Sequence, residues 1–182
     1  MTAPYTSETL PAACAAFTAL QEGRIPWMYR DNAKAGNVTA CCGHLFRTAQ
    51  EVADVLGVPV EVVRPQFDAV AAARPGMRDT YYSTFSRLRF TDSQIDSLTA
   101  SDLQEHIGNC ARIVPGFWQM PGPVQVAAVD LAFNTGSLSH WPKFCAACEA
   151  GNWQEAAVQS NRPQLPARSA ATKALILSAV QS

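Results

Sequence analysis

The chain has 182 residues, of which 48% are apolar, enough for the core of one globular domain or of two lobes that share a helix. A formal net charge of −1 gives no support for strongly anionic partners, so nucleic acid and anionic membranes are disfavoured. The longest N-terminal apolar stretch, residues 10–20, is too short to cross a bilayer and follows no basic segment. We therefore expect neither a membrane span nor a signal peptide.

The first predicted element is a helix from residue 10 onward, with apolar side chains at helical spacing and Gly23 as its stop. Residues 24–46 then carry Pro, Gly and Asn between short β-prone runs, which predicts a small antiparallel sheet. Glu22 ends the helix. The macrodipole disfavours a charged Glu at a helix C-terminus, and a general acid needs a carboxyl group whose charged form is discouraged.

Helical signals follow the sheet. Thr48 and Glu51 fit a capping box for a helix that ends near Gly57, and a second helical run extends from Pro59 to about residue 73. The segment 74–90 is the least readable, because its Tyr-Tyr-Ser-Thr-Phe run fits either strand or helix.

The C-terminal half, 91–182, is predicted to be a helical lobe. Its most apolar helix spans residues 123–133 and is closed by Gly136, so we expect it to be central and buried. Further helices are predicted over 142–150, 153–160 and 167–179.

Three residues in the N-terminal region bear groups suited to glycoside hydrolysis. Asp31 follows Glu22 by nine positions, within the predicted hairpin, and Thr39 follows eight positions later. Two carboxyl groups suffice to cleave a glycosidic bond, because one protonates the leaving oxygen and the other activates a water or stabilises the sugar cation. Each residue also has an ordinary interpretation, as a solvated helix end, a turn residue and a strand residue.

These residues, followed by Gly43-His44-Leu45, resemble the signature of the phage-type lysozymes, the muramidases of glycoside hydrolase family 24. The run Ala-Ala-Val-Asp-Leu-Ala-Phe-Asn-Thr-Gly at 127–136 and the later Gly-Asn-Trp-Gln-Glu-Ala-Ala run at 151–157 are similar to two further family segments. The stretch between Asp31 and Thr39 is about two residues longer than in the family, and Ala-Cys-Cys replaces its small apolar residues before Gly43.

The resemblance implies a mainly α (α+β) lysozyme-like fold in a single domain, 1–182. It would have a small β lobe over about 24–46, a helical lobe over 91–182, and a candidate insertion over about 58–90. It also implies catalytic roles for Glu22 and Asp31, with Thr39 orienting the water or the Asp, and inversion at the anomeric carbon. No metal or organic cofactor is implied.

Asn134 and Arg162 are candidate sugar-binding residues; their ordinary interpretations are helix capping for Asn134 and a surface charge for Arg162. The resemblance gives Gly43 and His44 structural positions near the site, with His44 paired to a carboxylate.

Six cysteines are present, at 14, 41, 42, 110, 145 and 148. The Cys145–Cys148 spacing is CxxC, but no second CxxC or His pair completes a zinc site. We expect most of these thiols to pack as small buried hydrophobic groups, with disulfides as the alternative.

The resemblance thus implies a peptidoglycan hydrolase, expected to be a monomer, that cleaves between N-acetylmuramic acid and N-acetylglucosamine. Its partner would be the bacterial glycan strand, without nucleic acid. Two rivals stay open: a lytic transglycosylase, and a binding or structural module that has lost the chemistry. The biology also stays open between a phage endolysin for lysis and a delivered antibacterial toxin with an immunity or delivery protein. In either case we expect synthesis in the cytoplasm and action on a cell wall.

Overall fold

The computed structural model describes residues 2–31 and 37–180, and these fall into two compact units. Unit 1 comprises residues 1–21 and 100–182, and unit 2 comprises residues 22–99. Helix α5 (Asp92–Ile113) contributes residues to both units, because the boundary follows Thr99. The chain is mainly helical with one small antiparallel sheet, as the sequence predicts.

Unit 2 contains the sheet, in which the strands lie in the order β1 (Ile25–Arg30), β2 (Val38–Cys41) and β3 (His44–Phe46). Tyr29 pairs with Thr39 and Arg30 with Val38, and the register shifts by a bulge between Ile25 and Tyr29. These strands confirm the sheet predicted over 24–46.

A tight turn joins β2 to β3, with the Gly43 N–H donating to the Ala40 carbonyl at 3.1 Å. Gly43 has φ 93°, which a residue without a Cβ adopts at no steric cost. Cys41 has φ 62° in the same turn, a left-handed conformation that costs a non-glycine residue about 1–2 kcal/mol. The positive φ of this turn thus explains why a glycine occupies position 43.

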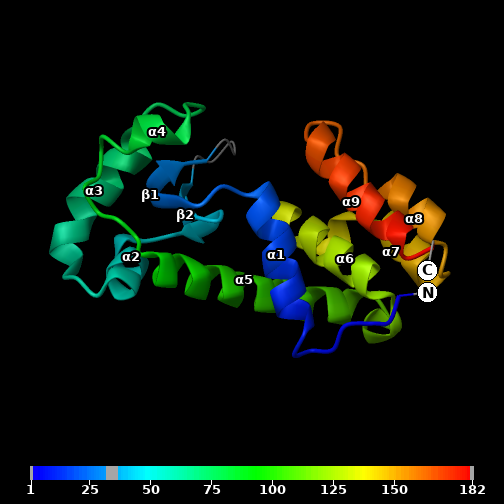
Figure 1. The fold of residues 1–182 in the computed structure, drawn as a ribbon. Helices are drawn as coiled ribbons and strands as arrows, with labels where there is room; N and C mark the ends of the chain where they lie inside the picture. The colour runs from blue at the N-terminus through cyan, green and yellow to red at the C-terminus, as the bar shows by residue number, and fades with distance from the viewer. Residues whose placement is uncertain (1, 32–36, 181–182) are drawn as a thin grey trace. The chain divides into compact units, whose positions relative to one another are not determined.

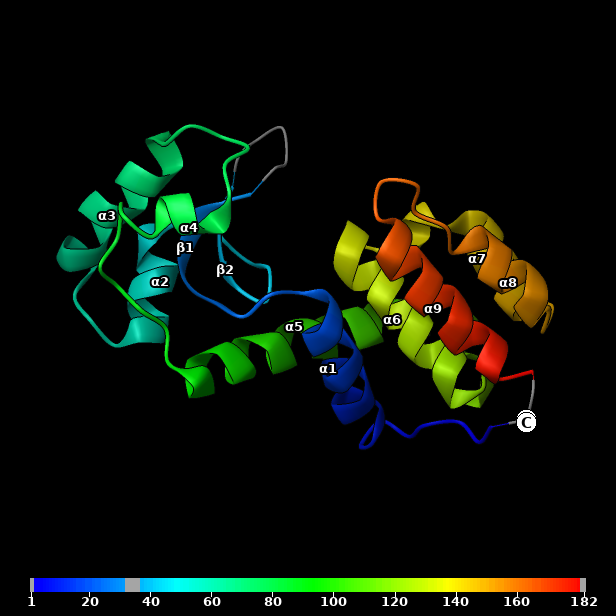
Figure 2. The same ribbon diagram turned by 45° about the horizontal axis from the view of Figure 1, so that its top comes forward.

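Three helices of unit 2 pack around the sheet: α2 (Ala49–Leu56), α3 (Val60–Ala72) and the short α4 (Asp79–Tyr82) (Figure 2). The predicted capping box is present, because Thr48 caps the Glu51 N–H and the Glu51 carboxylate accepts from the Thr48 N–H. Gly57 ends α2 in the left-handed conformation. Met28, Val38 and Phe46 of the sheet join the core that these helices cover.

The segment 74–90 belongs to the core of unit 2. The α4 residue Tyr82 is fully buried, and its hydroxyl donates to the Arg74 carbonyl at 2.8 Å. The Trp27 indole of β1 donates to the Asp79 carbonyl at 3.0 Å, and the Phe90 N–H donates to the Pro26 carbonyl at 2.9 Å. This segment therefore packs directly against β1.

Unit 1 is helical, and α6 lies between α1 and α9 in it (Figure 1). Its elements are α1 (Leu10–Gln21), the C-terminal part of α5, the 3-10 turn η1 (Phe117–Gln119), α6 (Gly122–Thr135), the 3-10 turn η2 (Leu138–His140), α7 (Pro142–Glu149), α8 (Trp153–Gln159) and α9 (Pro166–Ser178). Helix α6 is buried from Gly122 to Ala132, and Gly136 ends it with φ 83°, which confirms the predicted central helix.

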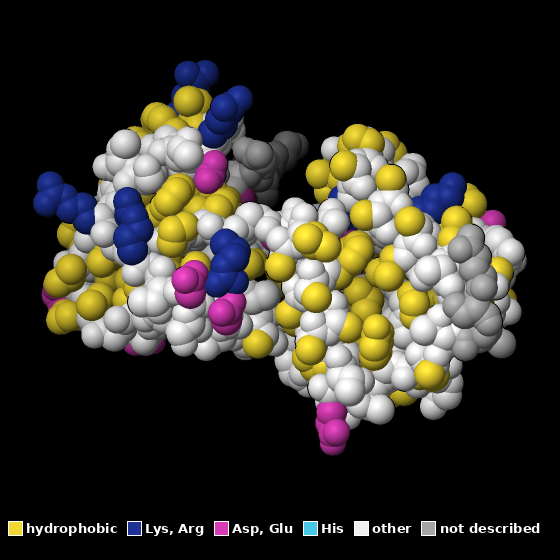
Figure 3. All heavy atoms as spheres, viewed as in Figure 1, with side chains coloured by type: hydrophobic (Ala, Val, Ile, Leu, Met, Phe, Trp, Pro, Cys, Tyr) yellow, Lys and Arg dark blue, Asp and Glu magenta, His cyan; other side chains and the backbone are white. Residues whose placement is uncertain are grey.

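Hydrophobic side chains are also gathered on the surface of unit 1, where Figure 3 shows them over α1 and α6. They line a cavity of about 310 Å³ that includes Phe17 and Leu20 of α1, Val126 of α6 and Leu175 of α9. Leu20 is 81% exposed. No described helix is both long enough and apolar enough to cross a membrane.

Candidate active site

The three predicted catalytic residues all lie in unit 2. Asp31 directly follows β1, and its N–H donates to the Asn37 carbonyl at 3.0 Å, which extends the β1–β2 pairing by one step. Alternate residues of a strand share one face of a sheet. Asp31 and Tyr29 of one strand therefore share a face with Asn37 and Thr39 of the other. Met28, Val38 and Ala40 occupy the opposite face, toward the core.

The Asp31 carboxylate is held by Asn37. The Asn37 backbone N–H donates to Asp31 Oδ1 at 3.0 Å, and the Asn37 amide donates to Oδ2 at 3.3 Å. Asp31 is half-buried, so it stays accessible to a ligand while its orientation is fixed from the opposite strand.

Glu22 is the first residue after α1 and is half-buried. The Tyr29 phenol is affected by the charges of both Glu22 and Asp31. Burial and then the negative charges of Glu22 and Asp31 raise the pKa of Tyr29 well above its usual range. The charges of both carboxylates thus influence the same phenol, although nine positions separate Glu22 and Asp31 in the sequence.

A third carboxylate also acts on Tyr29. The charge of Asp79, at the start of α4, raises the Tyr29 pKa further. Sequence reasoning overlooked Tyr29, Asn37 and Asp79. Tyr29 and Asn37 could have been identified from the sequence. A tyrosine two residues before Asp31, for example, must lie on the same face of the strand. Asp79 lies 48 residues after Asp31 in the sequence, and no local signal connects them.

Thr39 is 4% exposed, and its hydroxyl donates weakly to the Asn37 carbonyl at 3.5 Å. It lies beside Tyr29 on the neighbouring strand, with little surface available to a ligand. His44 is half-buried, and its ring lies edge-to-face against Phe46 with centroids 4.6 Å apart. That contact accords with the structural position expected of His44, while its pairing to a carboxylate stays a prediction.

The two predicted sugar-binding residues, Asn134 and Arg162, lie in unit 1. Asn134 is half-buried in the last turn of α6. The Arg162 side chain is 0% exposed, which leaves no surface for direct contact with a sugar in this structure. Its partner is Asp130 of α6, whose Oδ2 accepts from Arg162 Nη2 at 2.7 Å. Arg162 is therefore neither a surface charge nor an accessible sugar contact here.

Arg162 belongs to a buried ionic network. Asp130 also accepts from the Arg168 guanidinium, through Nη2 at 2.7 Å and Nε at 3.0 Å, and from the Thr172 hydroxyl at 2.9 Å. Two guanidinium groups thus share one carboxylate. Arg162 Nε and Nη1 are buried without a hydrogen-bond partner among the described residues. Sequence spacing gave no sign of this network, because its members come from α6, α9 and the segment before α9.

All six cysteines are buried free thiols, which confirms the expectation that they pack as small hydrophobic groups. Burial raises the pKa of Cys14 and of Cys148 to about 12, so neither is a thiolate near neutral pH. The pKa of Cys110 is raised by burial and by the charges of Cys14, Cys145 and Cys148 nearby. Within the described ranges, no group of three or more His, Cys, Asp or Glu side chains is arranged to hold a metal ion.

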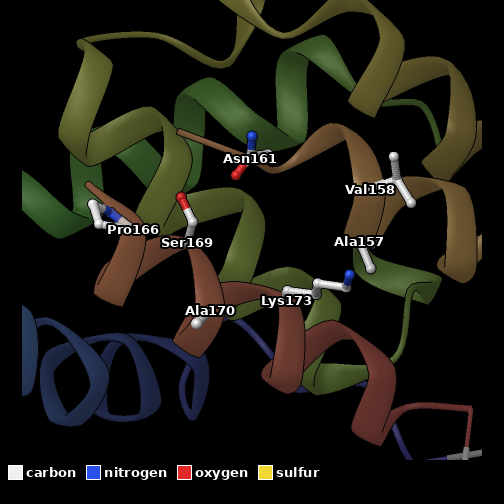
Figure 4. Close-up of a pocket in the computed structure, with 7 residues that line it drawn as sticks. All are labelled: Ala157, Val158, Asn161, Pro166, Ser169, Ala170 and Lys173. Carbon is white, nitrogen blue, oxygen red and sulfur yellow. The ribbon is translucent and has the colours of Figure 1, made fainter. Parts of the chain in front are cut away.

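A separate cavity of about 400 Å³ lies in unit 1 between α8 and α9. Figure 4 shows the Lys173 side chain extending along it beside Ala157, with Asn161 and Ser169 at the other end. The Ser169 hydroxyl is already engaged, since it accepts from the Arg162 N–H at 2.7 Å and donates to the Arg162 carbonyl at 3.0 Å.

The candidate site in unit 2 carries the groups that general acid–base chemistry requires. Asp31 and Tyr29 share one sheet face of fixed register, and the charges of Glu22 and Asp79 also act on the Tyr29 phenol. Comparison with known proteins adds no family name: no protein-family model matches the chain, and no curated protein matches it.

Proposed function

We propose that this protein is a peptidoglycan hydrolase, a muramidase that cleaves the β-1,4 bond between N-acetylmuramic acid and N-acetylglucosamine. The observation that supports it most is the Asp31 carboxylate that Asn37 orients on the hairpin, with the charges of Asp31 and Glu22 acting on the same Tyr29 phenol. Paired carboxyl groups with different surroundings are the usual equipment of glycoside hydrolases. The lysozyme-like fold that the sequence resemblance implies belongs to the same proposal.

In the proposed mechanism Glu22 is the general acid. It follows the C-terminus of α1, where the helix dipole disfavours negative charge. Its proton passes to the glycosidic oxygen as the bond to the anomeric carbon breaks. A sugar alkoxide is a poor leaving group without that proton, so protonation of the leaving oxygen is the step that most needs a general acid.

Asp31 has the complementary role. The two donors of Asn37 fix its orientation, and a carboxylate can activate the attacking water or stabilise the oxocarbenium-like transition state. Thr39 supports it from the neighbouring strand. The sequence resemblance implies inversion, in which the water attacks the face opposite the leaving group. The chemistry needs no metal or organic cofactor.

The direct test is digestion of purified bacterial peptidoglycan, followed as loss of turbidity, with mass analysis of the released fragments. A muramidase releases fragments with a free reducing muramic acid, each one water heavier than the anhydro product of a transglycosylase. Hydrolysed fragments would support the proposal, and anhydro fragments would assign the rival transglycosylase chemistry. Intact walls at high protein concentration, with sedimentation of the protein alongside them, would indicate a binding module instead.

A further inference from the structure

We propose that the cavity between α8 and α9 binds a small ligand that carries an amide group beside a free carboxylate, the chemistry of the C-terminus of a short peptide. The cavity lies within unit 1, whereas Glu22 and Asp31 belong to unit 2. The inference therefore goes beyond the proposed muramidase function and does not rest on it.

One face of α9 forms a wall of this cavity. The α9 residues that line it are spaced i, i+3, i+4 and i+7, positions that share one face of a helix: Pro166, Ser169, Ala170 and Lys173. The residues in the middle are small, and α8 presents the equally small Ala157 to them. A space of about 400 Å³ therefore remains between the two helices, which is at the lower end of the range for small-molecule sites.

Lys173 makes one end of the cavity positive. Its side chain extends from α9 toward Ala157 of α8 (Figure 4). No Asp or Glu is among the described residues that line the cavity, and no described carboxylate forms an ion pair with Lys173. An ammonium group forms its strongest hydrogen bonds with ionised acceptors, so a carboxylate on the ligand is its natural partner.

The other end of the cavity offers groups that match a peptide bond. The exposed Asn161 side chain makes no hydrogen bond with any residue that the structure describes. Its amide has both donors and an acceptor, so it can bond the C=O and the N–H of one peptide group. The Ser169 hydroxyl is fixed by the Arg162 N–H and carbonyl and keeps one lone pair for a ligand N–H.

The apolar part of the lining favours a peptide end over a bare inorganic anion. Ala157, Val158 and Ala170 are apolar, and a ligand with a small apolar side chain removes their surface from water. Guanidinium groups, which suit phosphate, are absent from the described lining. The nearest ones in the sequence, Arg162 and Arg168, are instead buried against Asp130.

The test titrates the full-length wild-type protein with N-acetyl-L-alanyl-L-alanine and, separately, with the same dipeptide ending in an amide. Nuclear magnetic resonance shifts of backbone and Asn side-chain amides follow the binding. We expect the acid form to saturate with a Kd on the order of 1 mM, and to shift the signals of Asn161 and Ser169. The amide form should bind roughly fivefold more weakly, because it lacks the ion pair with an exposed lysine.

Two variants separate the charge of the site from its shape. Lys173→Met should weaken binding of the acid form roughly fivefold and leave the amide form unchanged. Lys143→Met, which removes an exposed lysine of α7 in the same unit, is the matched control and should bind both as the wild type does. Ala170→Leu should abolish binding of both, because it fills the cavity. Leucine is a good helix former, so this variant should keep the wild-type melting temperature.

Equal affinities of the wild type for the acid and amide forms would overturn the inference, as would an unchanged preference in Lys173→Met. The absence of a saturable shift at the solubility limit of both dipeptides would also overturn it. Inorganic phosphate is titrated in parallel, and tighter binding of phosphate than of the dipeptide acid would assign the cavity to a bare anion. Dipeptide binding by a protein that leaves cell walls intact would support this site and refute only the muramidase proposal.

Discussion

Asn37 holds both oxygens of the Asp31 carboxylate, one through its backbone N–H at 3.0 Å and the other through its amide at 3.3 Å. Both donors come from one residue on the opposite strand, so the hairpin register sets the direction of the carboxylate. A substitution at Asp31 therefore changes the chemistry of a group whose position the backbone already fixes.

Asp31→Asn should reduce wall cleavage by about 10²–10⁴-fold, because an amide can neither take a proton from water nor balance a developing cation. Initial rates of turbidity loss on purified peptidoglycan measure this effect. Asp68→Asn, an exposed change on α3 in the same unit, is the control and should leave the rate unchanged. Retention of more than a tenth of the wild-type rate by Asp31→Asn would remove it from the proposed mechanism.

Glu22→Gln should lower the rate by about 10³-fold or more, at the upper part of the range for general acid catalysis, since the leaving sugar oxygen needs a proton. The glutamine keeps the shape and hydrogen-bonding capacity of the glutamate, so thermal melting should show a folded protein. Glu61→Gln, exposed in the first turn of α3, is the matched control. Near-wild-type clearing by Glu22→Gln would show that this carboxyl group is not the acid.

Asp130→Asn should destabilise the protein by about 3–5 kcal/mol, because it leaves the buried guanidinium groups of Arg162 and Arg168 without their shared counter-ion. Chemical denaturation followed by far-ultraviolet circular dichroism measures the free energy of unfolding. Thr172→Val, which removes one hydroxyl of the same network, should cost only about 1 kcal/mol. Equal losses from both changes would mean that charge is not what makes Asp130 important.

Acidification should weaken unit 1 through His106. Burial lowers the pKa of His106 below 6.5, against the smaller opposing effects of Glu105 and Asp102. The unfolded chain then binds a proton more readily than the folded one, so this stability is complete above about pH 6.5 and falls as pH drops below it. Buried Nδ1 has no partner among the described residues, which fits a neutral ring.

His106→Gln should therefore flatten the dependence of unfolding free energy on pH between about 7.5 and 5, measured by urea denaturation. His140→Gln, which removes an exposed histidine, controls for the loss of one imidazole. An unaltered slope in His106→Gln would show that other groups cause the acid sensitivity.

The segment 74–90 allows a further separation of activity from folding. Tyr81→Ala should change wall cleavage less than tenfold, which is about 1.4 kcal/mol of barrier. Tyr82→Ala should instead destabilise by about 3–5 kcal/mol, since Tyr82 is fully buried and bonded to the Arg74 carbonyl. A stable Tyr82→Ala protein, or a Tyr81→Ala protein with a hundredfold loss of rate, would contradict this division.

Most helices could be predicted because their end signals are local. Thr48, Glu51 and Gly57 delimit α2 within ten residues of sequence, and the buried run of α6 ends at Gly136 as expected. The turn of α4 could not be predicted, because two tyrosines favour a strand locally and the burial of Tyr82 against unit 2 decides for a helix. Tertiary packing overrode local propensity there.

The residues of the candidate site also divide into those with a local sequence signal and those placed by long-range contacts. Glu22 and Asp31 were predicted from residue type and spacing, whereas Asp79 and the burial of Arg162 depend on contacts over 32 residues or more. A charged residue is expected to be exposed unless the sequence indicates a buried partner of opposite charge. For Arg162 that partner is Asp130, within the helix that the sequence marks as apolar.

Because every thiol is buried, the rate at which each cysteine is alkylated reports local opening of the structure around it. Cys41 and Cys42 lie in the core of unit 2, while the other four cysteines lie in the core of unit 1. A membrane-permeant or soluble alkylating reagent reacts with a buried thiol only when the surrounding structure opens. Peptide mapping of the alkylated cysteines over time would therefore measure the opening rate of each unit separately. The experiment uses the unmodified wild-type protein and requires no knowledge of its substrate.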